Sequence, residues 1–482
     1  MNERAVDVVV VGAGPTGLLL ASELVLAGVE VAVVERLTEP DLAPKARGIG
    51  ALACELLERR GLGHALEVEE DSGATAARRP MAGMFGGLFL IDQALQREPG
   101  RKMRGVTQAS LERMLAEHAR TLGVEIWRGD AVESFVDDGA HVRVDVRGSG
   151  GPRVLSCSFL VGCDGGRSAV RKQAGFDFAG TAPTLTGRQG IVELDHPERL
   201  PPGWRRTATG VLSYYGGRLS VIEFDRPSPD RDTPLTAAEL EDSLRRVSGA
   251  DVRILLLHAG ARWTDHARQA TQYQRGRVLL AGDAAHIHSP FGGQGLSLGL
   301  LDAANLGWKL AATVRGDAPD GLLDTYLAER HPVAASVLEN TRAQLALMRP
   351  DPQTSALRQI MADLLTTYPD VNRHVGEMIS GVATRYELGV DDDPLVGRLI
   401  ADRDLTIDGS PTRLYSLMHD GKWLLINGSA EPIEHEGTWA ARTRSVSAAE
   451  TLSMLIRPDG CIAWTGRPGG LRIAVDRWFR TN

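Results

Sequence analysis

The sequence predicts an α/β fold in which a parallel, doubly wound sheet is interrupted by a mostly antiparallel sheet and followed by a further strand-rich unit. A β-branched run, Val6 to Val11, leads through clustered glycines into an apolar helical stretch, which is typical of a buried strand, turn and helix. Residues 181–274 carry alternating, aromatic-spotted runs that indicate antiparallel strands. From about residue 390 the chain is again strand-rich.

The composition excludes several classes of protein. The chain has 482 residues, with 54 Lys and Arg against 62 Asp and Glu, a net charge of −8 and an isoelectric point near 5.9. This charge argues against a protein that neutralises nucleic-acid phosphates. Four cysteines without a C-x-x-C pair favour a reducing compartment, and no apolar run reaches the roughly 18 residues of a membrane span. We expect a cytoplasmic, soluble monomer or homodimer with no nucleic-acid or membrane partner.

The first unit carries a dinucleotide-binding pattern. Three glycines form G-x-G-x-x-G between a strand and a helix, and an acidic residue ends the next strand 18 positions after the last glycine. The first glycine permits a tight turn, the second lets the backbone approach a pyrophosphate, and the third lets the helix pack on the strand. The acidic residue disfavours a 2′-phosphate, which leaves the adenosine of FAD or NAD. The expected contacts are Gly12, Gly14, Pro15, Thr16, Gly17 and Glu35.

Three later segments follow in order, at 161–171 (VGCDGGRSAVR), 276–286 (GRVLLAGDAAH) and 290–297 (PFGGQGLS). With these motifs the chain resembles, over nearly its whole length, the class A flavoprotein aromatic hydroxylases of the para-hydroxybenzoate hydroxylase fold. Within them it is most similar to the oxygenases of angucyclines and other aromatic polyketides. The resemblance implies a Rossmann-like FAD-binding domain, an inserted antiparallel substrate domain and a thioredoxin-like C-terminal domain. The implied boundaries are 1–178 and 276–388 for the FAD-binding domain with its helical connection, 179–275 for the substrate domain and 389–482 for the last.

The flavin end of the cofactor has its own expected contacts. Asp283, at a strand end, can accept a hydrogen bond from the ribityl chain, although it could also cap a helix. The glycine-rich helix start aims N–H groups and a positive dipole end at an anion, which the resemblance identifies as the N1–C2=O edge of the reduced flavin. The resemblance puts Asp164 near the pyrophosphate, though a buried cap is an equal alternative. The expected set is Asp164, Asp283, Pro290, Gly293, Gln294, Gly295, Leu296 and Ser297.

Three more residues are assigned to the cofactor by the resemblance, and Arg36 by its position directly after Glu35. Arg47 matches an arginine over the phosphates, and Gln108 matches a residue that reaches the ribityl or adenosine side. Arg36 packs along the adenosine or is solvated, and Val132 lies on the strand that pairs with the adenine or is a core valine.

The substrate is expected under the inserted sheet, beside Pro290. Met84 and Phe85 suit a flat aromatic ligand, and Tyr214 and Phe224 lie in the inserted runs, although each could be an ordinary core residue. The C-terminal domain has one cysteine, Cys461, so it carries no dithiol chemistry.

Two departures from the family affect the expected flavin site. Ser297 takes the place of an asparagine, and the stretch Gly50–Glu55 lacks the family's Arg-Thr pair before its glutamate. Both bear on how efficiently NAD(P)H reduces the flavin. The pair His286 and His288 has no third ligand nearby, so no metal is expected, and no catalytic acid or base is identified.

Taken together, the resemblance implies an FAD-dependent monooxygenase that consumes NADPH or NADH and molecular oxygen. It would hydroxylate a polycyclic aromatic, polyketide-type substrate through the flavin C4a-hydroperoxide. The alternatives are a Baeyer–Villiger or epoxidising oxygenase, including one that modifies an antibiotic, and a flavin-binding protein that has lost oxygenation.

Overall fold

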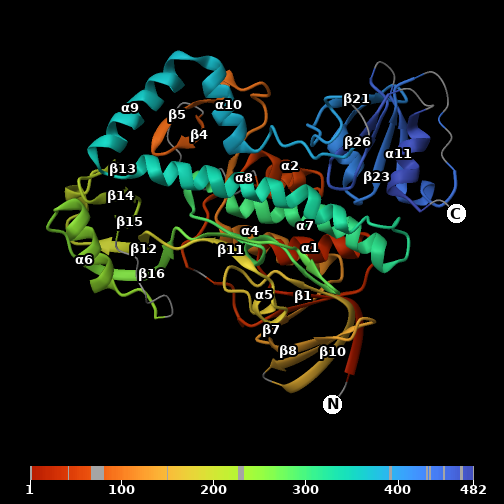
Figure 1. Cartoon of the computed structure of the whole chain (residues 1–482), viewed down its shortest axis with the longest axis horizontal. Helices are drawn as coiled ribbons and strands as arrows, with labels where there is room; N and C mark the ends of the chain where they lie inside the picture. Colours follow the sequence, from red (N-terminus) through yellow and green to blue (C-terminus); the bar gives the residue numbers. More distant parts are fainter. Residues whose placement is uncertain are drawn as a thin grey trace.

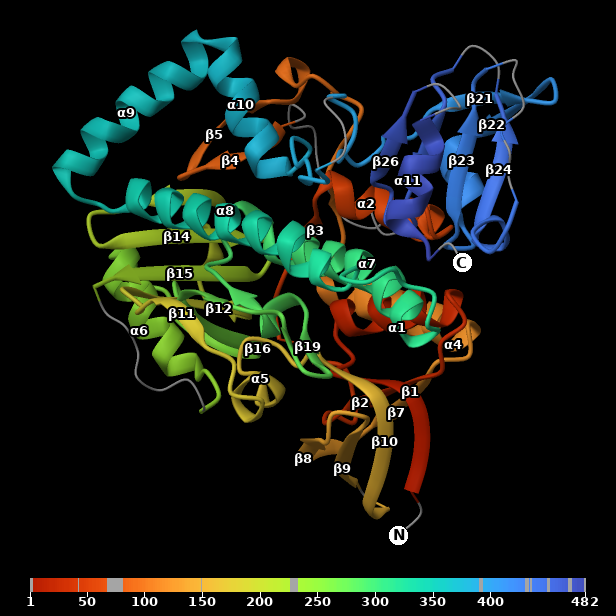
Figure 2. The ribbon, with the colours of Figure 1, turned by 45° about the vertical axis from the view of Figure 1, so that its right-hand side comes forward.

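The computed structural model describes residues 3–41, 43–66, 81–148, 150–225, 233–389, 393–429, 433, 436–448, 451–466 and 470–480. Two long helices, α7 (Gly295–Val314) and α8 (Asp324–Met348), cross its middle, and Figures 1 and 2 show the inserted sheet near one end of this pair and the C-terminal strands near the other. No helix of the described residues is long and apolar enough to cross a membrane.

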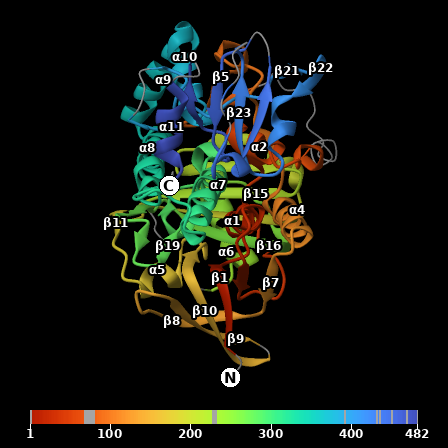
Figure 3. The same ribbon diagram turned by 90° about the vertical axis from the view of Figure 1, so that its right-hand side faces the viewer.

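A largely parallel sheet forms the N-terminal part. Its eight strands run in the order β18-β19-β10-β1-β2-β7, with β9 paired to β10 and β8 to β9. Val8, Val9 and Val10 of β1 are fully buried, which is why this stretch has no polar alternation. Figure 3 shows α1 and α7 between this sheet and the C-terminal strands. The bounds are β1 (Glu3–Val11), α1 (Pro15–Leu26), β2 (Val31–Glu35), α4 (Gln108–Thr121), β7 (Glu125–Arg128), β8 (Ala131–Asp137), β9 (Val142–Gly148), β10 (Gly151–Gly162), α5 (Ala169–Gln173), β18 (Gln274–Arg275) and β19 (Val278–Leu280).

The inserted sheet has five antiparallel strands in the order β13-β14-β15-β12-β16. Helix α6 (Ala237–Ser248) covers one face through Leu240, Leu244 and Val247. The other face packs on Phe291 and the end of α8. Alternate residues of one strand therefore have different surroundings. The bounds are β12 (Leu185–Leu194), β13 (Gly203–Arg206), β14 (Gly210–Tyr215), β15 (Arg218–Phe224) and β16 (Ile254–Thr264).

The C-terminal unit comprises strands β21–β26 and helix α11. Its main sheet is mixed, in the order β24-β23-β25-β26, with β23 parallel to β24 and the other pairs antiparallel. Together with the parallel and inserted sheets it confirms the predicted fold class. The bounds are β21 (Asp404–Ile407), β22 (Ser410–Arg413), β23 (Trp423–Asn427), β24 (Thr443–Ser447), β25 (Met454–Ile456), β26 (Ile462–Thr465) and α11 (Leu471–Trp478).

Smaller elements connect these units. They are β3 (Gly48–Ile49), α2 (Ala51–Glu58), β4 (Met81–Phe85), β5 (Leu88–Asp92), β6 (Arg104–Gly105), β11 (Phe178–Thr181), β17 (Ala267–Ala270), β20 (His286–Ile287), α9 (Pro352–Thr367) and α10 (Pro369–Ser380).

Candidate functional site

The turn between β1 and α1 is shaped by glycine at each motif position. Gly12 has a φ of +106°, which side chains rarely adopt. A Cβ on Gly17 would lie 2.0 Å from the Gly12 carbonyl oxygen, so α1 can pack here only without a side chain. A Cβ on Gly14 would meet no protein atom within 4 Å. The second glycine thus faces open space at the start of a helix, as a pyrophosphate contact requires.

Glu35, at the end of β2, is oriented by the same turn. Its carboxylate accepts hydrogen bonds from the N–H groups of Ala13 and Leu37, each at 2.8 Å. Each oxygen keeps lone pairs after these bonds. The carboxylate is therefore fixed beside the glycine turn and can still accept hydrogen bonds from ribose hydroxyls.

The glycine turn at residues 12–17 and the segment 276–286 meet at Thr16. A Cβ on Gly282 would lie 2.7 Å from the Thr16 hydroxyl oxygen, and one on Gly299 would lie 2.5 Å from it. The turn η3 (Gly282–Ala284), which we call the Asp283 turn, thus lies between the starts of α1 and α7. Asp283 is exposed while its neighbours on both sides are buried, so its carboxylate projects from a rigid support.

The start of α7 leaves backbone groups accessible. A Cβ on Gly293 would meet nothing within 4 Å, and Pro290 is exposed. Leu296 packs against the main core. Gln294 is turned inward, where its side chain accepts from Asn340 at 2.8 Å and donates to the Met378 carbonyl at 3.3 Å. Because the Gln294 carbonyl also accepts from the Leu298 N–H at 2.9 Å, the backbone N–H is the group that Gln294 can offer a ligand.

Ser297 contacts the other segment that departs from the family. Its hydroxyl accepts a hydrogen bond from the Gly50 N–H at 2.8 Å, at the start of α2. Leu52, within the same segment, is buried against the C-terminal unit. The two departures are thus joined in one contact, which sequence spacing could not reveal.

Asp164 acts as a helix cap. One carboxylate oxygen accepts from the N–H groups of Ala169 and Val170 at 2.6 and 3.2 Å. The other oxygen is buried and has no hydrogen-bond partner. The capping alternative is therefore realised, and one acceptor remains unused.

Of the remaining nucleotide-side residues, Gln108 donates through its side chain to Glu112 at 2.8 Å and through its backbone N–H to the Ala46 carbonyl at 3.0 Å. Arg36 is exposed. Val132 pairs with Val146 and packs against the core, as an ordinary core valine would.

Arg47 faces a second arginine that the sequence did not single out. Burial, reinforced by the charge of Arg47, lowers the pKa of Arg218 to about 10. Arg218 donates to the Lys45 carbonyl at 2.7 Å and to Gln189 at 3.5 Å, and among the described residues neither arginine has a carboxylate partner. Two nearby guanidinium groups without a carboxylate partner favour an anion close to them. No local motif marks Arg218, because it reaches Arg47 from the inserted sheet.

The predicted substrate residues are not all together. Met84 and Phe224 belong to the cluster that contains Phe291, next to Pro290. Phe85 packs in a separate cluster with α10. Tyr214 packs on the opposite, α6-covered face of the inserted sheet, because side chains alternate along a strand.

An aromatic trio that the sequence analysis missed lies beside Pro290. Phe291 contacts Trp204 and Trp263 edge-on, with ring centroids 6.0 and 5.6 Å apart. The two tryptophans come from β13 and β16, so this contact joins the inserted sheet to the start of α7.

The two histidines face different partners. His286 contacts Asp302 at 2.6 Å, whereas Nδ1 of His288 contacts the Ser289 carbonyl at 2.7 Å. Burial lowers the pKa of His288, which favours the neutral ring. Within the described ranges no group of three side chains could hold a metal ion.

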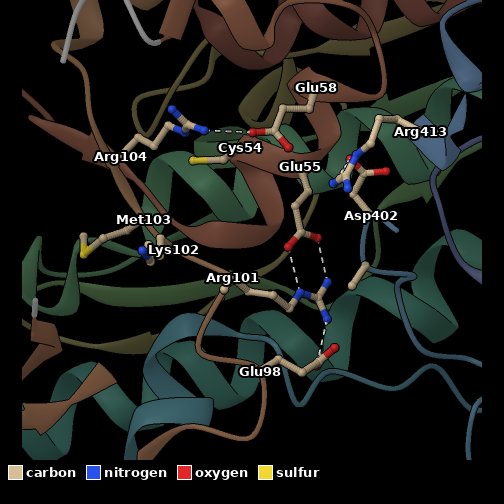
Figure 4. A pocket seen from close by; sticks show the side chains of 12 residues that line it. Cys54, Glu55, Glu58, Glu98, Arg101, Lys102, Met103, Arg104, Asp402 and Arg413 are labelled. Carbon is tan, nitrogen blue, oxygen red and sulfur yellow. Dashed lines mark hydrogen bonds and ion pairs between the residues drawn. The ribbon is translucent and has the colours of Figure 1, made fainter. Parts of the chain in front are cut away.

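A cavity of about 720 Å³ lies outside these motifs, between α2, residues 98–104 and residues 401–413. Figure 4 shows its walls, where Glu55 pairs with Arg101 at 2.6 Å and Glu58 with Arg104 at 3.2 Å. Most of the charged side chains that line the cavity are therefore paired with one another, as Asp402 also is with Arg413 at 2.6 Å.

The site as a whole fits FAD. One region is surrounded by the open backbone at the starts of α1 and α7, by Glu35 at the end of β2 and by the projecting Asp283. Thr16 lies at the start of α1 and contacts the start of α7. These features define an FAD-binding flavoprotein.

Comparisons with known proteins agree. Residues 5–341 match the family described as FAD binding domain, and residues 393–481 match the aromatic-ring hydroxylase C-terminal family. The chain is 40% identical to the 12-dehydrotetracycline 5-monooxygenase/anhydrotetracycline 6-monooxygenase of Streptomyces rimosus, with 98% of both proteins covered. It is similar to CabE, an aromatic hydroxylase from angucycline biosynthesis (35% identity, TM-score 0.86, covering 98% and 99%), and to the Diels-Alderase PyrE3 of pyrroindomycin biosynthesis (33%, TM-score 0.83, covering 98% and 99%).

The chain therefore belongs to the FAD-binding domain family. It is an FAD-dependent aromatic monooxygenase of the class A hydroxylase fold.

Proposed function

We propose that this enzyme hydroxylates a polycyclic aromatic, polyketide-type substrate at the expense of NADPH or NADH and molecular oxygen. The single observation that carries the proposal is the aromatic trio of Phe291, Trp204 and Trp263 beside Pro290. Edge-on aromatic contacts of this kind suit a flat ring system. The names of the relatives that act on tetracyclines and in angucycline biosynthesis support the same substrate class.

Bound FAD supplies the chemistry: reduced by the nicotinamide, it activates oxygen, of which one atom enters the substrate and the other leaves as water. The protein's part is to bind, orient and exclude water. The turn at Gly14 and the carboxylates of Glu35 and Asp283 would hold the nucleotide and ribityl parts, and the start of α7 would stabilise negative charge on the reduced ring. The Arg47–Arg218 pair would hold a phosphate or another anionic group beside the inserted sheet.

The test is turnover by the purified yellow holoenzyme with a panel of polycyclic phenols and quinones, supplied with NADPH or NADH. The expected result is substrate-dependent NAD(P)H oxidation with one oxygen atom from ¹⁸O₂ in a ring hydroxyl, identified by mass and NMR. A ring-expanded lactone or an epoxide would instead identify a Baeyer–Villiger or epoxidising oxygenase. Protein that binds no FAD would refute every version of the proposal.

One observation favours a second candidate, a flavin-bound protein without oxygenation. The Ser297 hydroxyl oxygen accepts from the Gly50 N–H in place of the family's asparagine side chain, and one of the similar structures is named a Diels-Alderase. FAD binding together with substrate conversion in the absence of NAD(P)H and oxygen would support this candidate over hydroxylation.

A further inference from the structure

A buried carboxylate holds the Asp283 turn from behind. Asp302, in α7, is 0% exposed. One of its oxygens accepts from the Gly282 N–H at 3.1 Å and contacts Nε2 of His286 at 2.6 Å. These two contacts lie on either side of Asp283. They therefore fix the direction in which the exposed Asp283 carboxylate projects.

The second oxygen of Asp302 continues the network into α8. It accepts from Nε of Arg330 at 2.7 Å, and Arg330 is also fully buried. The other guanidinium nitrogens donate to the Leu298 carbonyl in the first turn of α7, at 3.1 Å, and to the Tyr386 hydroxyl, at 3.0 Å. Burial alone would raise the pKa of Asp302, but His286 and Arg330 outweigh it and lower this pKa. One guanidinium thus supports both the Asp283 turn and the start of α7.

Tyr386 is fixed to the C-terminal unit. Its N–H donates to the Gly397 carbonyl at 2.9 Å, and the Gly397 N–H donates to the Ile462 carbonyl of β26 at 2.9 Å. Its ring lies 5.6 Å from the guanidinium of Arg457, which is also buried. The Tyr386 hydroxyl is therefore positioned by the C-terminal sheet and presented to Arg330.

Arg457 links the C-terminal unit to α8 at Glu329, the residue directly before Arg330. Its guanidinium donates to Glu329 at 2.9 and 2.7 Å, and Glu329 also contacts Lys309 of α7 at 2.9 Å. Adjacent residues of one helix thus have two tasks, Glu329 toward the C-terminal unit and Arg330 toward the Asp283 turn. Buried ion pairs that are also hydrogen-bonded restrict the relative positions of their helices more narrowly than apolar contacts do.

We propose that the C-terminal unit is part of the FAD-retaining machinery, because it sets the position of the Asp283 turn through Tyr386, Arg330 and Asp302. The inference rests on the proposed role of Asp283 at the cofactor. The three residues are positioning residues, since they act through the turn. By thermodynamic reciprocity, bound FAD must in turn stabilise the docking of the C-terminal unit.

The test removes one hydroxyl group. Tyr386→Phe in the full chain should weaken FAD binding about 5- to 10-fold, measured by titrating apoprotein with FAD and following flavin fluorescence. Tyr415→Phe is the matched control, because Tyr415 is an equally buried tyrosine, within the C-terminal unit, whose hydroxyl contacts Glu55 and the Ile400 carbonyl rather than Arg330. We expect Tyr415→Phe to lower thermal stability to a similar extent with less than a twofold change in FAD affinity. Unchanged FAD affinity in Tyr386→Phe, or equal losses in both variants, would overturn the inference.

A second measurement does not depend on enzyme activity. Amide hydrogen exchange in β23, β25 and β26 should slow when FAD is added to the apoprotein, and this protection should be reduced in Tyr386→Phe. FAD binding that leaves these amides unchanged contradicts the coupling. Asp283→Ala separates the two proposals: if it retains FAD, the proposed cofactor site fails, whereas loss of FAD with an inert Tyr386→Phe defeats only the inference made here.

Discussion

Gly14→Ala should weaken FAD binding and leave stability nearly unchanged, whereas Gly17→Ala should mainly lower stability, although the two glycines are only three residues apart. Gly14 has φ −75° and ψ 177°, which any residue adopts, and an added Cβ meets no protein atom within 4 Å. At Gly17 the added Cβ lies 2.0 Å from the Gly12 carbonyl oxygen and 3.2 Å from Cβ of Cys163. The first substitution therefore fills ligand space, whereas the second fills space that the protein occupies.

The expected magnitudes differ accordingly. In Gly14→Ala, a poorer helix cap costs up to about 1 kcal/mol, and the reduced entropy of the unfolded chain offsets about 0.4–1 kcal/mol. The apoprotein should unfold within about 1 kcal/mol of the parent. The methyl group displaces the pyrophosphate from two backbone donors worth roughly 1.5–3 kcal/mol each, so FAD affinity should fall about 10²- to 10⁴-fold. Gly17→Ala should lose about 3 kcal/mol of stability or more, since overpacking against backbone cannot relax by a side-chain movement.

Two assays on apoprotein separate these outcomes. Urea unfolding followed by circular dichroism gives the free energy of unfolding, and titration with FAD gives the dissociation constant. A Gly14→Ala protein that binds FAD with the parent affinity would refute the placement of the pyrophosphate at this turn. A Gly14→Ala apoprotein as unstable as Gly17→Ala would show that the space is not open.

Three further predictions concern buried groups. The pKa values of Asp302 and Glu329 are lowered because their cationic partners outweigh burial. The unfolded chain therefore binds more protons than the folded protein below about pH 5, and the free energy of unfolding from urea titrations should fall from pH 6 to pH 3. A free energy of unfolding that does not change over this range would contradict the prediction. Ser297→Ala leaves the Gly50 N–H without its acceptor and should lower the free energy of unfolding by about 1–2 kcal/mol; an unchanged urea midpoint would argue against the contact. Burial raises the pKa of Cys54 to about 12, and all four cysteines are buried. Iodoacetamide at pH 8 should therefore label no cysteine in the native protein and four in urea. Labelling of any cysteine in the native protein would count against this burial.

The sequence predicted those features of the site that lie within short contiguous segments. The glycine turn and the Asp283 turn each follow a strand and Glu35 ends one, so the local strand pattern locates them without tertiary information. Asp302 was not predicted, because it reaches Gly282 only after α7 has packed over the turn. Arg218 was missed for the same reason, since it approaches the loop of Arg47 from β15 of the inserted sheet.

The substrate side was the least predictable part, because residue type alone does not give the face of a strand. Tyr214 was chosen as an aromatic residue in an inserted run, yet it packs toward α6. Val211, three positions earlier, packs with Phe291 on the opposite face. An odd separation along a strand reverses the face, so the register of the whole sheet is needed before any residue can be assigned to the substrate.

Most of the tryptophans pack at the two ends of the α7–α8 pair. Five of the eight tryptophans pack where the C-terminal unit docks, and Trp204 and Trp263 lie with Phe291 at the other end. Apolar packing at either end is non-directional and would tolerate small rotations of the helices. Between these ends, the carboxylates of Asp302 and Glu329 are held by several directional hydrogen bonds. It is therefore the buried charges that fix the angle between the helices, and with it the alignment of the Asp283 turn with the aromatic trio.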